Sequence, residues 1–282
     1  MADFTEVEAP GTVPAPVAVP GPAGPWERVR GELSRTGTVV VAGRLPDWRF
    51  LGGEAELPPL LGRDWRRYQV LSHPLTRERF AASRILLRHV VAAVIDTAAD
   101  QVDLAYQPGG RPYVRGCDQI DVSLSHTEEM VVVGVTRKGR IGVDVELVDR
   151  RMAGTGSESQ AYTPYELARL DADGADARND TLVRLWTLKE AYSKALGQGL
   201  RFRFTEFGFA LDAGRARLVR PDGTPVDGTG WAFGTHGVDG RYVVSAAVYD
   251  AGFGDTADLS VRTTLDTGLL DALLGTAGGG PG

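Results

Sequence analysis

"IDVSLSHTEEMVVVGVTRKGRIGVDVEL", residues 120–147, decides the fold class of this chain, because it holds three β-rich runs in close succession. The runs span residues 120–126, 130–136 and 140–147, and the polar segments "TEE" and "RKGR" supply the turns between them. This pattern predicts a three-stranded antiparallel meander.

The last of these strands carries two acids where a buried strand is expected. Side chains at i and i+2 of a strand share a face, so Asp144 and Glu146 point one way while Val143 and Val145 point to the core. A carboxylate without a partner is costly to bury. Two parallel carboxylates suit a hard cation such as Mg²⁺, although many solvated strand faces carry the same pattern. Taken alone, the pair leaves both interpretations open.

A strand and a helix precede the meander. Residues 36–44 lie between turn residues and predict a strand. Residues 75–95 show an apolar stripe at helical spacing, with Thr76 as a candidate N-cap. Another stripe on this helix indicates a solvated face and consists of Arg77, Arg84 and Arg88.

Two helices are predicted after the meander, which gives a mixed α+β pattern. Residues 162–170 start with a capping box that Glu166 closes. Residues 179–199 predict a longer helix, with Asp180 as its N-cap and Gly197 as its C-terminal stop.

The longer helix carries an acid and a lysine on one face. Glu190 and Lys194 are four residues apart, hence neighbours, and a surface ion pair would explain them. However, the chain has 31 Lys and Arg residues, and only Lys138, Lys189 and Lys194 are lysines. A lysine can lose its proton whereas an arginine effectively cannot, so a proton-transfer site would explain the choice. Lys189 falls nearer the apolar stripe, and its role stays open.

The first strand of the meander ends in "SLSH". Val122 and Leu124 alternate inward, while Ser123 and Ser125 face the other way. His126 follows at the turn. A lone histidine is more often structural than catalytic, but this one ends a strand of the same meander as the acid pair.

Composition excludes several classes of protein. The 282 residues are 43% hydrophobic and 24% charged, as in an ordinary globular protein, and the net charge of −6 disfavours nucleic-acid binding. No apolar run reaches about 18 residues, which disfavours a membrane span, and the N-terminus lacks a secretory pattern. Cys117 is the sole cysteine, which excludes intramolecular disulfides and fits a reducing cytoplasm. The two ends of the chain are predicted to be tails. Residues 1–25 are rich in Pro and Ala and predict a disordered tail, and residues 263–282 predict a second tail.

The blocks "GRP", "SLSH", "GVDVE" and "WTLKEAYSKALGQGL" resemble, in order and spacing, the 4′-phosphopantetheinyl transferase superfamily. The resemblance is to its larger, monomeric, surfactin-synthetase-activating type and covers residues 109–200. It implies two similar α+β lobes that form a pseudo-dimer, with coenzyme A in the cleft between them. The lobes would be residues 26–138 and 139–262.

The resemblance also implies roles for individual residues. Three acids would hold Mg²⁺ against the pyrophosphate of coenzyme A: Asp144, Glu146 and Glu190. The catalytic residues would be Glu190, Lys194 and His126, and coenzyme A would be bound by Arg84, Arg111, Ser125, His126 and Lys194. In this arrangement we expect Asp144 and Glu146 to face an open, wet cleft, with the metal rather than a protein cation as their partner.

Two further assignments are looser. Glu166 matches a family acid that can neighbour the metal, but the capping box explains it equally well, and the preceding phenylalanine of the family pattern is missing. Arg66 and Arg67 lie in the region that usually meets the 3′-phosphate of coenzyme A. Neither can be chosen over the other.

By this resemblance the protein is a Mg²⁺-dependent enzyme that moves phosphopantetheine from coenzyme A to a serine of an apo acyl or peptidyl carrier protein and releases 3′,5′-ADP. Carriers of polyketide or nonribosomal peptide synthases are the favoured partners, and a cytoplasmic monomer is expected. One alternative is a non-catalytic homologue that only binds carriers, which would be expected to lack one of the motif residues. The other is a different Mg²⁺-dependent phosphate-cleaving enzyme, which would leave "WTLKEAYSKALGQG" unexplained.

Overall fold

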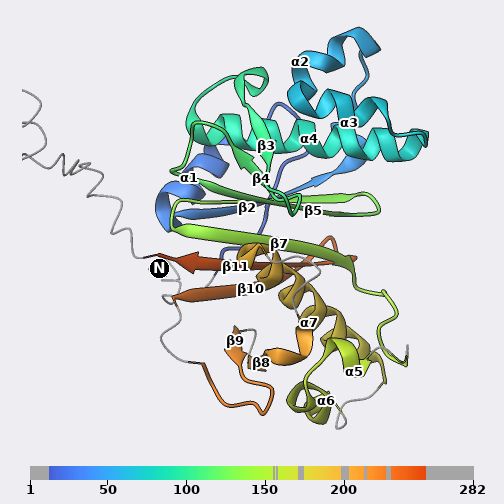
Figure 1. Ribbon diagram of the computed structural model, residues 1–282, viewed down its shortest axis with the longest axis vertical. Coiled ribbons are helices and arrows are strands. Elements are labelled where there is room, and N and C mark those ends of the chain that lie inside the picture. Colours follow the sequence, from blue (N-terminus) through green and yellow to red (C-terminus); the bar gives the residue numbers. More distant parts are fainter. Residues whose placement is uncertain are drawn as a thin grey trace, which may run out of the picture. The chain divides into compact units, whose positions relative to one another are not determined.

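Two β-sheets packed face to face separate two long helices in the computed structural model (Figure 1). The structure describes residues 13–251, except residues 155, 157, 171–174, 198–202, 213–214 and 227–229. The first sheet has the order β1-β2-β6-β5, which are Val17–Ala18, Thr38–Arg44, Met130–Thr136 and Asp121–Thr127. The second has the order β10-β11-β7, which are Trp231–Val238, Tyr242–Asp250 and Gly139–Leu147. Helix α4 (Pro74–Ile95) packs on the outer face of the first sheet and α7 (Ala175–Leu196) on that of the second.

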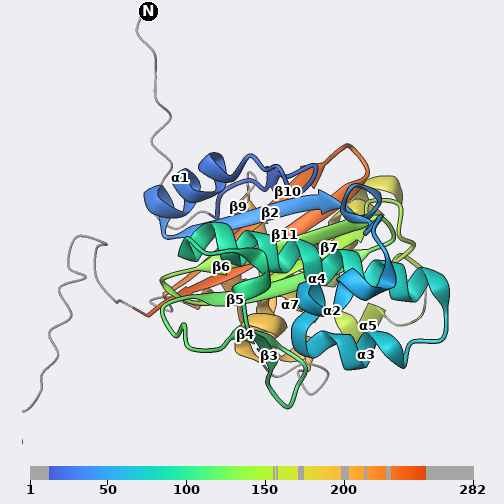
Figure 2. The same ribbon diagram turned by 90° about the horizontal axis from the view of Figure 1, so that it is seen from above.

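Smaller elements surround this four-layer core. The short helices are α1 (Trp26–Thr36), α2 (Leu57–Leu61), α3 (Trp65–Gln69), α5 (Glu158–Ala161) and α6 (Pro164–Leu170), and 3₁₀ turns span Leu45–Trp48, Glu54–Glu56, Gly62–Asp64, Ala99–Gln101 and Phe204–Glu206. Two hairpins pair β3 (Leu104–Tyr106) with β4 (Pro112–Val114) and β8 (Gly208–Asp212) with β9 (Arg215–Val219). Seen from above, α1 and α4 lie over the first sheet (Figure 2). The α+β prediction is confirmed, and no helix among the described residues is long and apolar enough to span a membrane.

The same order of elements occurs twice along the chain. Strand β2, helix α4, hairpin β3–β4 and hairpin β5–β6 are followed by β7, α7, β8–β9 and β10–β11. In each sheet the first strand pairs with the second strand of the last hairpin, which gives β2-β6-β5 and β7-β11-β10. This repeat supports the expected pair of lobes. Their boundaries stay a prediction, and residues 252–262 lie outside the described residues.

The predicted meander is only partly correct. Strands β5 and β6 form the expected antiparallel hairpin, but β7 leaves their sheet and pairs antiparallel with β11 instead. Gly139, with φ of 155°, starts β7 in a backbone conformation that favours glycine. The odd-numbered side chains of β7 then pack between the two sheets: Ile141, Val143 and Val145. Burial of this face on the opposing sheet, which local sequence does not reveal, decides the partner of β7.

A glycine brings α7 against β7 and so positions the candidate site. A Cβ at Gly142 would lie 1.9 Å from the carbonyl oxygen of Ala191. Only a residue without a side chain permits this approach. Consequently Asp144 and Glu146, on the same face of β7 as Gly142, look toward the C-terminal half of α7.

The helix limits agree with the sequence at most ends and differ at two. Helix α4 begins at Pro74 with His73 as N-cap, so Thr76 lies inside it. Helix α7 begins at Ala175, and Asp180 is an internal residue that pairs with Arg184 rather than the N-cap. Its predicted stop is confirmed, since Gly197 follows Leu196 with φ of 71°.

Each long helix buries one cation. The prediction that Arg88 lies on a solvated face is wrong: it is 2% exposed and donates hydrogen bonds to the carbonyl oxygens of Leu61 and Val102. Lys189 is 0% exposed on α7 and donates to two carbonyl oxygens before β8, at 2.6 and 2.8 Å. Its Nζ also lies 2.8 Å from Glu166 Oε2. Both cations therefore fasten a helix to the segment that leads into the next hairpin.

Part of the predicted N-terminal tail is ordered. Residues 13–25 pack on the core, with Val17 and Val19 buried and β1 parallel to β2. The indole of Trp48 donates to the carbonyl oxygen of Val19 at 3.0 Å. Alternate valines within the Pro-rich stretch supply this burial. Residues 1–12 and the predicted C-terminal tail lie outside the described residues.

Candidate active site

The candidate site forms where the outer edge of β7 meets β5. These are the outermost strands of two separate sheets, so the edge of β7 has no strand to pair with there. Side chains of β5 take that place: Ile141 N donates to Asp121 Oδ2 at 2.8 Å, and Val143 N donates to Ser123 Oγ at 3.1 Å. The backbone donors of this edge are thus satisfied by acceptors from the other half of the molecule.

Two cations satisfy the carbonyl groups of the same edge. Arg111 donates to the carbonyl oxygen of Ile141 at 2.6 Å, and Lys194 Nζ donates to that of Val143 at 3.2 Å. Arg111 also donates to the Asp121 carboxylate and to the carbonyl oxygen of Lys194. Burial raises the pKa of Asp121, and the Arg111 charge opposes that rise. The residue predicted to contact coenzyme A therefore joins β4, β5, β7 and α7 through its guanidinium.

Asp144 has a protein cation as its partner, contrary to expectation. Its Oδ1 accepts hydrogen bonds from Lys194 Nζ at 2.7 Å and from Ser125 Oγ at 2.8 Å. Lys194 Nζ also lies 2.9 Å from Ser125 Oγ. Asp144 is buried rather than facing an open, wet cleft. A buried carboxylate needs a counter-charge, and Lys194 can reach it because α7 lies so close to β7.

Glu146 also carries a protein cation. Arg150, four residues further on, donates a hydrogen bond to Glu146 Oε1. Burial raises the pKa of Glu146, the Arg150 charge lowers it, and the negative charge of Asp144 raises it further. Both acids thus have a protein cation as partner where none was expected, and their role as metal ligands stays a prediction.

Glu190 is the third acid, and its side chain makes no hydrogen bond or ion pair with any described residue. Burial raises its pKa, the charges of Asp144 and Glu146 raise it further, and the charges of Lys194 and Arg150 oppose the rise. The charges of the two acids place the three predicted metal ligands within electrostatic reach of one another. Nevertheless, no three or more His, Cys, Asp or Glu side chains converge on a metal position within the described ranges. The donor chemistry fits a hard cation, whereas the present side-chain arrangement serves Lys194 and Arg150.

His126 lies in a positive field. Removal of water around its ring lowers its pKa, and the charges of Arg84, Lys194 and Arg79 lower it further. Arg84 lies against two aromatic rings, with its guanidinium carbon 4.6 Å from the centre of Phe80. Cations from α4 and α7 thus converge on the end of β5, an arrangement suited to phosphate groups.

A cavity of about 440 Å³ opens beside these residues. It is lined by Gly109, Gly110, Arg111, Pro112, Ser123, Leu124, Trp186, Glu190, Ser193, Lys194, Gly197 and Phe204. Trp186 and Phe204 form an aromatic wall, with ring centroids 5.4 Å apart. The cavity brings Glu190 and Lys194 together with the "GRP" and "SLSH" segments.

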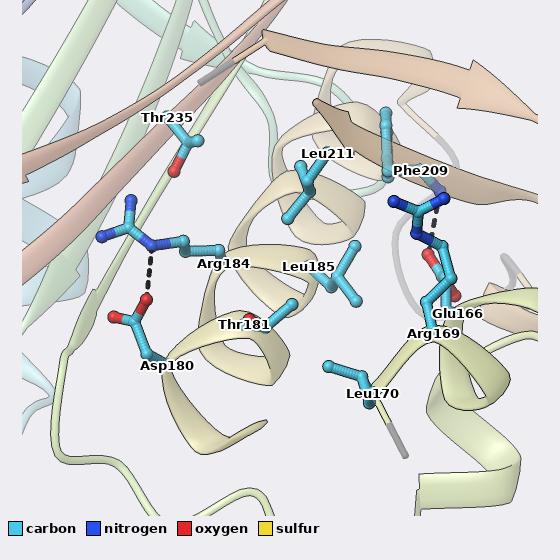
Figure 3. Close-up of a pocket in the computed structure, with 10 residues that line it drawn as sticks. All are labelled: Glu166, Arg169, Leu170, Asp180, Thr181, Arg184, Leu185, Phe209, Leu211 and Thr235. Atoms are coloured by element: carbon cyan, nitrogen blue, oxygen red, sulfur yellow. Dashed lines mark hydrogen bonds and ion pairs between the residues drawn. The ribbon is translucent and has the colours of Figure 1, made fainter. Parts of the chain in front are cut away.

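A second cavity, of about 430 Å³, lies beside the N-terminal half of α7 (Figure 3). Glu166 lines it but forms the predicted capping box, since Thr163 N donates to its Oε2 at 2.8 Å. Phe209 N donates to Oε1 at 2.9 Å, and Lys189 takes up the remaining charge. Glu166 therefore has a structural role, whereas Asp144, Glu146 and Glu190 line the candidate site.

Sequence reasoning placed Arg66 and Arg67 loosely and missed other residues. Both arginines are exposed, and Arg67 lies 5.6 Å from the centre of the Phe80 ring that also contacts Arg84. The residues missed were Arg79, Asp121, Arg150 and Trp186. Asp121 has the same i, i+2 alternation as Ser123, so its orientation was predictable. Arg150 lies only four residues from Glu146, but its contact with Trp186, like the position of Arg79 near His126, depends on elements far apart in the chain.

Known proteins are similar to this chain over the region that holds these residues. The family model described as the 4′-phosphopantetheinyl transferase superfamily matches residues 140–247. A phosphopantetheinyl transferase of Thraustochytrium sp. is 30% identical over 197 residues, which cover 65% of this chain and 68% of that protein. A 4′-phosphopantetheinyl transferase of Bacillus subtilis is 27% identical over 153 residues, which cover 54% and 66%.

A solved structure is also similar in part. A holo-(acyl-carrier-protein) synthase of Bacillus anthracis in complex with CoA (3′,5′-ADP) covers 39% of this chain and 95% of its own, at 19% identity and a TM-score of 0.33. The chain spans about half to two thirds of the length of the curated relatives it matches, with values from 47% to 68%.

Proposed function

The chain belongs to the 4′-phosphopantetheinyl transferase superfamily, and we propose that it transfers the 4′-phosphopantetheine group of coenzyme A to a serine of an apo carrier protein. The serine oxygen bonds to the phosphorus that carries pantetheine, the bond from that phosphorus to the bridging oxygen of the pyrophosphate breaks, and 3′,5′-ADP leaves. Coenzyme A is the donor substrate, and the acceptor is an acyl or peptidyl carrier.

One observation carries this proposal. Lys194 of α7, Ser125 of β5 and Asp144 of β7 meet in a triangle with sides of 2.7 to 2.9 Å. The three residues come from three separate sequence motifs, which the fold brings to one point. A structural ion pair alone would not need all three motifs to converge beside a cavity that Lys194 lines.

The proposal assigns Mg²⁺ to the carboxylates of Asp144, Glu146 and Glu190. A bound Mg²⁺ supplies positive charge that offsets the negative charge developing on the pyrophosphate. The donor set fits, because three hard oxygen ligands with raised pKa values at two of them lack sufficient counter-charge. Lys194 and Arg150 provide two positive charges for these three acids.

The chain's own residues perform the proton and phosphate steps. The Glu190 carboxylate accepts the proton of the carrier serine. Lys194 Nζ donates a hydrogen bond to the departing phosphate of 3′,5′-ADP. His126 and Arg84 bind the phosphates, and Arg111 holds the backbone of Lys194 in place.

The proposal also covers the acceptor carriers, the cellular location and the oligomeric state of the enzyme. Polyketide or nonribosomal peptide carriers are its acceptors, and the protein acts as a cytoplasmic monomer. The alternatives are a homologue that binds carriers without modifying them and a different phosphate-cleaving enzyme. None of Asp144, Glu190 and Lys194 is missing, which favours the active transferase over the first alternative.

One experiment separates the three functions. The protein is incubated with coenzyme A, Mg²⁺ and a panel of purified apo carriers, and each carrier is weighed by intact mass spectrometry. A gain of one phosphopantetheine is expected on at least one carrier, together with release of 3′,5′-ADP. Release of an ADP species without any carrier would favour the phosphate-cleaving alternative. Carrier binding without a mass change on any carrier would favour the binding homologue.

A further inference from the structure

Arg150 stands between the carboxylate site and the aromatic wall of the cavity. It follows the end of β7, and its guanidinium donates to Glu146 Oε1. The same guanidinium lies over the ring of Trp186, with 5.3 Å between its carbon and the ring centre. A guanidinium that lies over an aromatic face is attracted to it. The Arg150 side chain therefore has a second favourable contact, with Trp186, that does not depend on Glu146.

The backbone of Arg150 is fixed while its side chain is accessible. Asn179 Nδ2 donates to the carbonyl oxygen of Arg150 at 3.0 Å, and Asn179 Oδ1 accepts from Met152 N at 2.9 Å and Ala153 N at 3.1 Å. These bonds tie the segment after β7 to α7. The Arg150 side chain is nevertheless 39% exposed. It can change partners without moving the segment that carries it.

The site has more negative than positive side chains. Three carboxylates share two protein cations: Lys194 is paired with Asp144, and Arg150 is paired with Glu146. Glu190 has no such partner among the described residues. A divalent cation among these acids would repel Arg150, and the guanidinium on Oε1 competes with it for the negative charge of the Glu146 carboxylate.

We infer that Arg150 is an internal counter-ion that neutralises Glu146 while the site holds no metal and releases it when a divalent cation binds. This inference rests on the proposed function, because it takes Glu146 to be a metal ligand. Arg150 is a positioning residue here and acts through Glu146. The free energy of breaking the pair reduces the apparent metal affinity, so removal of Arg150 should strengthen metal binding.

Mn²⁺ binding to the full chain, measured without coenzyme A by the loss of the free-ion EPR signal, tests the inference. Arg150→Gln should bind Mn²⁺ about tenfold more tightly than the unmodified chain, which corresponds to about 1.4 kcal/mol. Arg150→Lys keeps a cation and should bind nearly as the unmodified chain does. Arg151→Gln removes a neighbouring exposed charge and should leave the affinity unchanged, because Arg151 does not hold Glu146.

The inference is overturned if Arg150→Gln binds Mn²⁺ no more tightly, or if Arg151→Gln tightens binding equally. Transfer of phosphopantetheine to an apo carrier is measured on the same preparations. Unchanged Mn²⁺ affinity in Arg150→Gln with normal transfer by the unmodified chain would refute only the role of Arg150. Absence of both Mn²⁺ binding and transfer in the unmodified chain would refute the proposed function as well.

Discussion

The outer edges of β2 and β7 are equivalent in topology but are covered in different ways. Each strand opens one of the two repeats and pairs on its inner side with the second strand of a hairpin. The edge of β2 is covered by the backbone of β1, with Val17 opposite Val41 and Val19 N donating to the carbonyl oxygen of Ala42 at 2.9 Å. The edge of β7 is covered by the side chains of Asp121, Ser123, Arg111 and Lys194.

The difference shows how one architecture yields one reactive cleft. An open strand edge must be covered. A backbone strand covers it with main-chain hydrogen bonds and apolar packing. Side chains cover it at wider spacing, and they bring a lysine and a serine within reach of Asp144. The site thus lies at the edge that lacks a covering strand.

The largest effect should follow from changing the acid beside the edge of β7. Glu190→Gln removes the proposed base and should lower the transfer rate by about 10²–10⁴. The fold should persist, because the Glu190 side chain makes no hydrogen bond to a described residue. Initial rates of carrier modification and an unfolding curve measure both.

Glu129, in the turn between β5 and β6, supplies the matched control for Glu190→Gln. Glu129 pairs with Arg44 at 3.0 Å in an exposed position, and Glu129→Gln should leave the transfer rate unchanged. If Glu129→Gln and Glu190→Gln lowered the transfer rate equally, the claim that only the edge of β7 is reactive would be wrong.

The second effect concerns the arginine that holds the edge of β7. Arg111→Gln leaves Asp121 without its cation and two carbonyl groups without their donor, and should lower the free energy of unfolding by about 3 kcal/mol. Arg111→Lys should not restore it, because one ammonium group cannot reproduce the planar fork. Urea unfolding measures the loss.

Arg115 supplies the comparison for Arg111. It lies on the same hairpin, and its exposed ion pair with Asp103 spans 3.5 Å. Arg115→Gln should change the free energy of unfolding by less than about 1 kcal/mol. If Arg111→Gln is equally mild and only raises the KM for coenzyme A, then Arg111 binds phosphate and does not hold the edge.

A smaller effect is expected at the covered edge. Val17 is 3% exposed, and Val17→Ala should lower the free energy of unfolding by about 2 kcal/mol, because it removes buried apolar surface from β1. The rate per folded molecule should not change, since β1 pairs with β2 at the other edge of the first sheet from β5. Ala18→Ser, on the exposed face of the same strand, should affect neither quantity. Loss of rate without loss of stability in Val17→Ala would link β1 to the reaction.

The smallest expected effect is a shift in the pKa of His126. The pKa of His126 is lowered, so its NMR titration midpoint should lie below 6.5, and Arg79→Gln should move it upward. A lowered pKa in the folded state means that the unfolded chain binds this proton more readily. The histidine therefore costs stability as pH falls through 6.5 toward the folded midpoint. A midpoint at or above 6.5 would contradict the positive field around β5.

Local sequence patterns predicted the elements and most side-chain directions. The long helix α4, the hairpin β5–β6, the stop at Gly197 and the shared face of Asp144 and Glu146 all follow from periodicity or from local backbone preferences. These features depend on residues close together in the chain. For the same reason the resemblance carried by four short motifs was sufficient to indicate the superfamily.

Pairing between distant segments could not be predicted in the same way. Arg88 has the spacing of a surface residue, and only the carbonyl groups of Leu61 and Val102 explain its burial. The partner of β7 depends on which face the opposite sheet buries. The cations on Asp144 and Glu146 come from another element or from beyond the strand end, so the sequence indicated acids without their partners.

Hydrogen–deuterium exchange with and without coenzyme A and Mg²⁺ tests most directly whether the edge covered by side chains is the reactive one. In the free protein, amides of Ile141 and Val143 should exchange faster than those along β2, because side chains open more readily than a paired strand. The ligands should slow exchange in β5, β7 and the second half of α7 and leave β1 and β2 unchanged. Slower exchange along β1 and β2, or no change along β7, would contradict this account.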